Sequence, residues 1–133
     1  MREIHAYSLK KDGDARVARN FRVREFACQD GSDPVMIAPL LAVVLQAIRG
    51  VAGRAVTITS AYRTPGHNAK VGGAEQSQHL YGLAADIVVY GMAPREVAAI
   101  ARDLMPDWGG VGIYTQKGFT HIDVREDRAD WEG

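Results

Sequence analysis

The sequence has one cysteine, Cys28, among its 133 residues. A single thiol excludes an internal disulfide and gives no further information about the compartment in which the protein works. Cys28 follows the apolar residues Phe26 and Ala27, and we interpret it as a small packed residue rather than a nucleophile or a metal ligand.

The sequence also has no excess of charge of either sign, no long apolar run and no apolar signal-peptide region near residue 1. Sixteen basic and sixteen acidic residues cancel, so we expect neither a nucleic-acid partner nor a basic membrane-binding patch. No stretch approaches the roughly 18 apolar residues of a membrane span, and the N-terminus has no apolar signal-peptide region. We therefore expect synthesis in the cytoplasm without a signal peptide, and no membrane partner.

The length and the order of the apolar patterns predict one α+β domain. We expect residues 1–20 to form an N-terminal arm or an edge strand and residues 21–133 to form a single domain. Apolar residues at intervals of three and four predict helices, and β-branched or alternating runs predict strands. This order of elements favours a mainly antiparallel sheet with helices packed on it. The helices are expected at 35–49 and from 94 to 105, and the strands at 54–61, 83–90, 108–114 and 119–125.

A candidate metal site lies in Ser-Gln-His-Leu-Tyr-Gly-Leu-Ala-Ala-Asp, residues 77–86. It places His79 seven residues before Asp86, with Gly82 between them to allow a sharp turn. Asp86 interrupts an apolar run typical of a buried strand, and a buried carboxylate must be paired or bound to metal. His79 and Asp86 are therefore two candidate zinc ligands.

The third candidate ligand is His121, in the second strand of the expected hairpin. Strand alternation puts Phe119, His121 and Asp123 on one face, with Asp123 roughly 6.5–7 Å from His121 along the strand. A set of two histidines and one aspartate suits zinc. From spacing alone, histidines that only make structural hydrogen bonds remain the alternative.

Several motifs, in order along the chain, resemble the zinc D-Ala-D-Ala carboxypeptidase family, which includes related peptidoglycan endopeptidases such as phage endolysins. The resemblance runs from about Phe21 to Arg125. It rests on Ser-Ala-Tyr-Arg-Thr-Pro at 60–65, Val-Gly-Gly-Ala at 71–74, the stretch 77–86, Gly-Gly-Val-Gly-Ile-Tyr at 109–114 and His-Ile-Asp-Val at 121–124. It implies a hedgehog/DD-peptidase-like fold and a zinc metallopeptidase that cuts peptidoglycan stem peptides.

The resemblance also implies roles for individual residues. One zinc ion per chain would be held by His79, Asp86 and His121. Arg63 matches an arginine that binds substrate or stabilises the developing oxyanion, a role that suits a planar and permanently charged guanidinium. Ser77 and Tyr81, in the motif around His79, are further candidates for substrate binding.

The sequence departs from part of the family at Gly118. Several members carry an acidic residue there, three positions before the last zinc histidine. Asp123 is then the candidate general base, and its alternative role is to orient a histidine ligand.

Two functions and several properties stay open at this level. The first function is hydrolysis as a D-Ala-D-Ala carboxypeptidase or an endopeptidase. The second is a catalytically silent zinc-containing domain that binds wall peptide or a protein partner. We expect a monomer that acts on the cell wall if lysis or another export route delivers it.

Overall fold

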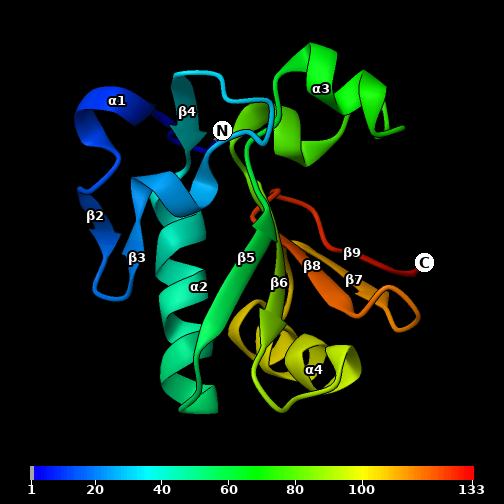
Figure 1. Ribbon diagram of the computed structural model, residues 1–133. Coiled ribbons are helices and arrows are strands. Elements are labelled where there is room, and N and C mark those ends of the chain that lie inside the picture. Colours follow the sequence, from blue (N-terminus) through cyan, green and yellow to red (C-terminus); the bar gives the residue numbers. More distant parts are fainter. Residues whose placement is uncertain (1) are drawn as a thin grey trace.

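A five-stranded sheet with the strand order β5-β6-β8-β7-β9 lies at the centre of the computed structural model, which describes residues 2–133 (Figure 1). Every neighbouring pair is antiparallel except β7 and β9, which run parallel. The α+β class, with a mainly antiparallel sheet and packed helices, is therefore confirmed. The strands are β5 Val56–Ser60, β6 Ala84–Val89, β7 Gly110–Tyr114, β8 Phe119–Asp123 and β9 Ala129–Glu132.

Two long helices pack against this sheet and form the core with it. They are α2, Pro39–Ala52, and α4, Pro94–Leu104, and they contact each other as well as β6. Their buried apolar side chains meet those of the central strands, as the apolar periodicity of both segments predicts. Fully buried members of this core include Leu41, Leu45, Ile48, Val97, Ile87 and Ile122.

The N-terminal part of the chain forms two small antiparallel sheets beside α2 (Figure 1). β1, His5–Ser8, pairs with β4, Pro34–Ile37, and β2, Arg16–Ala18, pairs with β3, Phe21–Arg22. A short helix, α1 Leu9–Asp12, separates β1 from β2. The 3-10 helix η1, Val23–Phe26, follows β3 and buries Val23 and Phe26. The domain division at residue 20 stays a prediction, and residue 1 lies outside the described part.

The helix expected at 35–49 begins later and ends later. Residues 34–37 are the strand β4, and α2 begins at Pro39. A residue before proline is disfavoured in the helical region, and Ala38 is accordingly extended, with φ −72° and ψ 126°. At the other end the helix continues through Gly50 and stops at Gly53, which has a left-handed φ of 65°.

The polar tail after residue 125 contains a strand that the sequence analysis did not identify. β9 adds to the edge of the sheet beside β7, with Gly112 and Trp131 as partners in the register. Arg102 of α4 fixes this strand, because its Nη2 lies 2.7 Å from Asp130 Oδ1 and 3.2 Å from the Ala129 carbonyl oxygen. Among the described residues, no helix combines the length and the apolar character that crossing a membrane requires.

Candidate metal centre

His79 is delivered by a short 3-10 helix, η2 Gln78–Tyr81, that lies just before β6. Ser77 begins this turn by accepting a hydrogen bond from the His79 backbone N–H, 3.3 Å away. Gly82 ends it with a φ of +73°, and a Cβ at this position would collide with the backbone of Met36. Only glycine combines a positive φ with this close approach to Met36. Gly82 therefore allows the chain to reverse direction between His79 and the strand that carries Asp86.

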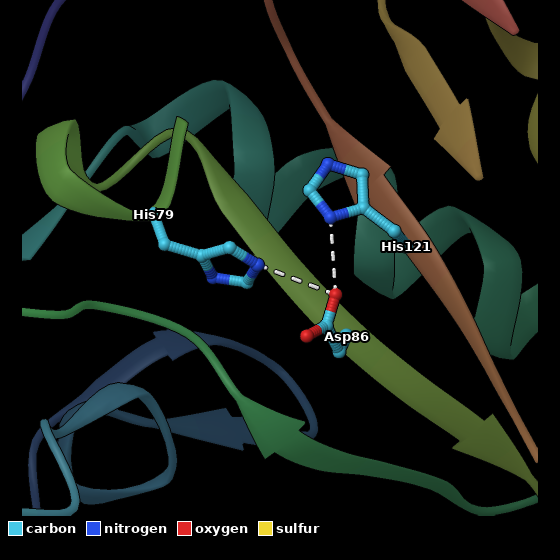
Figure 2. A group of neighbouring side chains, drawn as sticks. All are labelled: His79, Asp86 and His121. Carbon is cyan, nitrogen blue, oxygen red and sulfur yellow. Dashed lines mark hydrogen bonds and ion pairs between the residues drawn. The ribbon is translucent and has the colours of Figure 1, made fainter. Parts of the chain in front are cut away.

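Asp86 on β6 and His121 on β8 are direct partners in the register of the sheet. Figure 2 shows the rings of His79 and His121 pointing at the same carboxylate. The Nε2 of His79 lies 3.3 Å, and the Nδ1 of His121 lies 3.0 Å, from Asp86 Oδ1. One potential ligand atom from each residue lies within 4.8 Å of the others, and all three residues are buried.

The ring nitrogens that face away from Asp86 are both engaged. The Nδ1 of His79 lies 2.6 Å from the carbonyl oxygen of Ala61 and donates to it, since a carbonyl only accepts. The Nε2 of His121 lies 2.8 Å from Asp123 Oδ2. With these outer nitrogens engaged, the nitrogen of each ring that faces Asp86 is the one that could give its lone pair to a metal ion once it has lost its proton. Two imidazole nitrogens and one carboxylate oxygen, aimed at one point, fit a zinc ion.

Electrostatics in the cluster follow from burial and from these contacts. Burial alone would raise the pKa of Asp86, but hydrogen bonds from His121 and His79 outweigh it and hold the pKa well below its usual range. Burial alone would lower the pKa of His121, whereas its hydrogen bonds to Asp123 and Asp86 raise it above the usual value. Without metal, the cluster therefore favours carboxylates and a protonated His121.

Asp123 is fully buried and its carboxylate is surrounded by donors. Arg125 binds it with two side-chain contacts, Nε to Oδ1 at 2.8 Å and Nη2 to Oδ2 at 2.7 Å, and the backbone N–H of Gly110 and of Arg125 also donate to Oδ1. Burial would raise the pKa of Asp123, but Arg125 and His121 lower it well below its usual range. Of the two roles considered from sequence, these contacts favour orientation of His121. The general-base role stays a prediction.

Arg63 lies directly beside the three candidate ligands. Its Nη2 is 3.5 Å from Asp86 Oδ2, and its side chain is 16% exposed. Ser60 and Asn68 hold the guanidinium, because its Nε donates to Ser60 Oγ and its Nη1 to Asn68 Oδ1, each at 3.3 Å. The charge is therefore fixed in position next to the centre.

A cleft of about 480 Å³ opens onto the centre. Three cationic side chains line it, and Asp86 is the only carboxylate among the described residues that do so. Ser77 lies in the wall, as expected of a substrate contact. Tyr81 does not: it is 43% exposed, and it borders an adjacent hollow with Arg2 and Ile4. The lining includes His79, Asp86, His121, Arg63, Lys117, Arg125, Tyr114, Phe119, Trp131 and residues 71–74 and 76–78.

Sequence reasoning did not propose four of the charged or aromatic side chains of this cleft as site residues: Tyr114, Lys117, Arg125 and Trp131. Tyr114 and Phe119 stack with ring centroids 4.4 Å apart, and the Lys117 Nζ lies 5.8 Å from the Tyr114 ring centroid. The single large aromatic in the polar tail was the only sequence signal for Trp131, and nothing local indicates which element it packs against.

Comparison with known protein families gives independent information on the candidate ligands and on Arg63. A model of the family described as Peptidase M15 matches residues 17–123, a span that contains all three candidate ligands, Arg63 and Asp123. The search of curated proteins found no match.

Proposed function

This chain belongs to the peptidase M15 family, the zinc D-Ala-D-Ala carboxypeptidase-like metallopeptidases, and from that premise we propose that it hydrolyses peptide bonds in peptidoglycan stem peptides with one zinc ion per chain. The observation that carries the proposal is the convergence of His79 Nε2, His121 Nδ1 and a carboxylate oxygen of Asp86 within 4.8 Å. Three such ligands with one open position are typical of catalytic zinc.

The three candidate ligands and the groups that hold them are suited to binding a zinc ion. When bound, zinc supplies a Lewis acid that acidifies a water molecule and polarises the scissile carbonyl. Ala61 and Asp123 hold the imidazoles of His79 and His121 in the tautomers that expose a lone pair to the ion. Asp86 adds negative charge at the centre, where a dication needs it.

Arg63 is proposed to stabilise the negative charge that develops on the scissile carbonyl oxygen. Its guanidinium is fixed by Ser60 and Asn68 before any substrate arrives. A donor held in place needs little reorganisation during the reaction, which is the basis of electrostatic stabilisation of an oxyanion. Ser77, which also lines the cleft, is proposed as a substrate contact.

The charge of the cleft supports a carboxypeptidase more than an endopeptidase. Arg63, Lys117 and Arg125 line it, and Arg125 is already paired with Asp123. Among residues 2–133, Lys117 has no carboxylate within ion-pair distance, so its ammonium group is available to a ligand. A free C-terminal carboxylate, such as that of terminal D-Ala, suits this cation, whereas an internal peptide bond offers it no charge.

A second candidate function is a zinc-containing domain that binds wall peptide or a protein partner without cutting it. It is favoured by the absence, within the described residues, of a carboxylate in the cleft other than Asp86. Asp123 is engaged by Arg125, and Gly118 is an exposed turn residue with a left-handed φ of +79°. The cleft would then lack a free carboxylate to act as the general base that takes the proton from water.

Metal analysis combined with a peptidase assay separates the two functions. Purified protein would be stripped with a chelator, reloaded with zinc, and incubated with peptidoglycan and with a stem pentapeptide ending in D-Ala-D-Ala. Chelator-sensitive release of D-Ala with about one zinc per chain supports the carboxypeptidase. Release of new amino groups from cross-linked peptidoglycan alone supports an endopeptidase. Zinc binding without release supports the silent domain, and the absence of zinc binding rejects both.

We also propose that the protein acts as a monomer on the cell wall, after lysis or another export route delivers it from the cytoplasm. The balance of sixteen acidic and sixteen basic residues supports a peptide substrate rather than a nucleic-acid or membrane partner. Size-exclusion chromatography with light scattering tests the oligomeric state.

A further inference from the structure

Four residues form one row across the sheet and connect the C-terminal strand to the metal centre. Asp86 is the register partner of His121, His121 of Gly112, and Gly112 of Trp131. Partners in register on neighbouring strands direct their side chains to the same face of the sheet. Trp131 therefore lies on the face that carries two of the candidate ligands, although it is outside the segment matched by the family.

Gly112 allows the indole of Trp131 to reach His121. A Cβ at Gly112 would lie 2.6 Å from Cε2 and from Nε1 of Trp131, closer than real contacts permit. The indole occupies the space of this missing side chain, and its ring centroid is 5.0 Å from that of His121. Any other residue at 112 would separate the two rings.

The indole is held in place and contacts the groups that hold His121. Its Nε1 donates to the Tyr114 hydroxyl at 2.9 Å. The Arg125 guanidinium lies 5.3 Å from its ring centroid, within the range of a cation–π interaction. Arg125 binds Asp123, and Asp123 accepts the hydrogen bond from His121. Trp131 thus contacts the imidazole directly and also the arginine that fixes its carboxylate partner.

We propose that Trp131 is a positioning residue of the metal centre: lying over Gly112, it fixes the His121 imidazole in the orientation that presents Nδ1 to the ion. The inference rests on the proposed zinc function. Groups that orient a metal-bound histidine typically change metal affinity by about 10- to 100-fold. Because Asp123 still holds Nε2 of His121, the loss of Trp131 is expected to lower zinc affinity by an amount near the lower end of that range.

Zinc affinity, measured by competition with a chromophoric chelator, tests this inference without any assay of turnover. We expect Trp131→Ala to weaken zinc binding by about tenfold, and Trp131→Phe, which keeps a flat ring over Gly112, to restore most of the loss. Gly112→Ala should weaken binding as Trp131→Ala does, because the new methyl group displaces the indole without removing it. Gly50→Ala is the matched control, since a Cβ there meets no atom within 4 Å.

A spectroscopic measurement reports on the same contact when a variant folds poorly. The chain has two tryptophans, so Trp108→Phe leaves Trp131 as the only indole. Cobalt(II) bound beside His121 should quench its fluorescence with a one-to-one endpoint, and the visible cobalt spectrum of Gly112→Ala should differ from that of Gly50→Ala. Circular dichroism and metal-free melting temperatures identify variants that fail to fold.

The outcomes separate this inference from the proposed function. If folded Trp131→Ala and Gly112→Ala bind zinc as tightly as the unmodified protein and give its cobalt spectrum, the positioning role is overturned while the zinc site stands. A cobalt titration that leaves the fluorescence of Trp108→Phe unchanged also overturns it. If the unmodified protein binds no zinc, the proposed function itself is rejected.

Discussion

Asp86 and His121 lie opposite each other on the antiparallel strands β6 and β8, and the Nδ1 of His121 is 3.0 Å from Asp86 Oδ1. The residues are 35 positions apart in sequence, so this contact depends on the register of the sheet. A one-residue slip would turn His121 to the opposite face. The geometry of the candidate metal centre therefore depends on the correct pairing of these two strands.

Removal of a candidate ligand should abolish metal binding. We expect His121→Ala to weaken zinc binding by more than about 100-fold, because even the partners of metal ligands contribute 10- to 100-fold, and to reduce peptidase activity to background. His67→Ala is the matched control, since His67 does not line the cleft. Metal content after dialysis and chelator competition measure the effect. Retention of zinc at wild-type affinity by His121→Ala would reject the ligand assignment.

Asp123→Asn distinguishes orientation of His121 from general-base catalysis. The substitution removes the negative charge that Arg125 binds and should lower the free energy of unfolding by about 1–3 kcal/mol. If Asp123 only orients His121, zinc affinity falls and turnover at saturating zinc is largely retained. If Asp123 is the base, turnover falls by about 10²- to 10⁴-fold even with zinc saturated. Measuring kcat at several zinc concentrations separates these results, and full turnover excludes the base role.

The stability of the metal-free protein should depend on pH through the same cluster. His121 has a raised pKa, so its contribution is complete below the ordinary value of 6.5 and is lost as pH rises through the raised value. Asp86 and Asp123 have lowered pKa values, so their contributions are complete above 3.8 and are lost as pH falls through the lowered values. These three groups together predict maximal stability between about pH 4 and 6.5.

Zinc binding should move the pH at which the protein is most stable to a higher value. Binding requires an unprotonated Nδ1 on His121, so zinc must displace the proton that the metal-free cluster retains. Melting temperatures measured from pH 4 to 9 with zinc and with chelator test this. A zinc-dependent increase that is larger at pH 5 than at pH 8 would contradict the predicted linkage.

Lys117 should contribute to selection of a free carboxylate. We expect Lys117→Gln to raise KM for a peptide ending in D-Ala-D-Ala by about tenfold, the equivalent of 1.4 kcal/mol in binding, with little change in kcat. The KM for the same peptide with an amidated C-terminus should not change in Lys117→Gln, because the amide carries no negative charge for Lys117 to bind. Lys10→Gln, a substitution at another exposed lysine, is the control. Equal effects on the acid and the amide would show that Lys117 does not read the carboxylate.

Local sequence patterns were sufficient for most elements and for the list of candidate ligands. The apolar periodicity predicted α4 and most of α2, β-branched and alternating runs predicted β5 to β8, and Gly82 predicted the turn between His79 and Asp86. The start of the first long helix was wrong, because the effect of Pro39 on the residue before it was not applied.

The chemistry of the centre was decided by tertiary structure. The sequence placed Asp123 on the same strand face as His121 and two residues before Arg125, but the donor from the neighbouring strand β7, the backbone N–H of Gly110, depends on the pairing of β7 with β8. Trp131 gave no local sign that it would reach His121, since that contact requires β9 to pair beside β7 and Gly112 to leave room for the ring. Local propensity sets elements over a few residues, whereas the order and register of strands join distant segments and depend on the packing of the whole core.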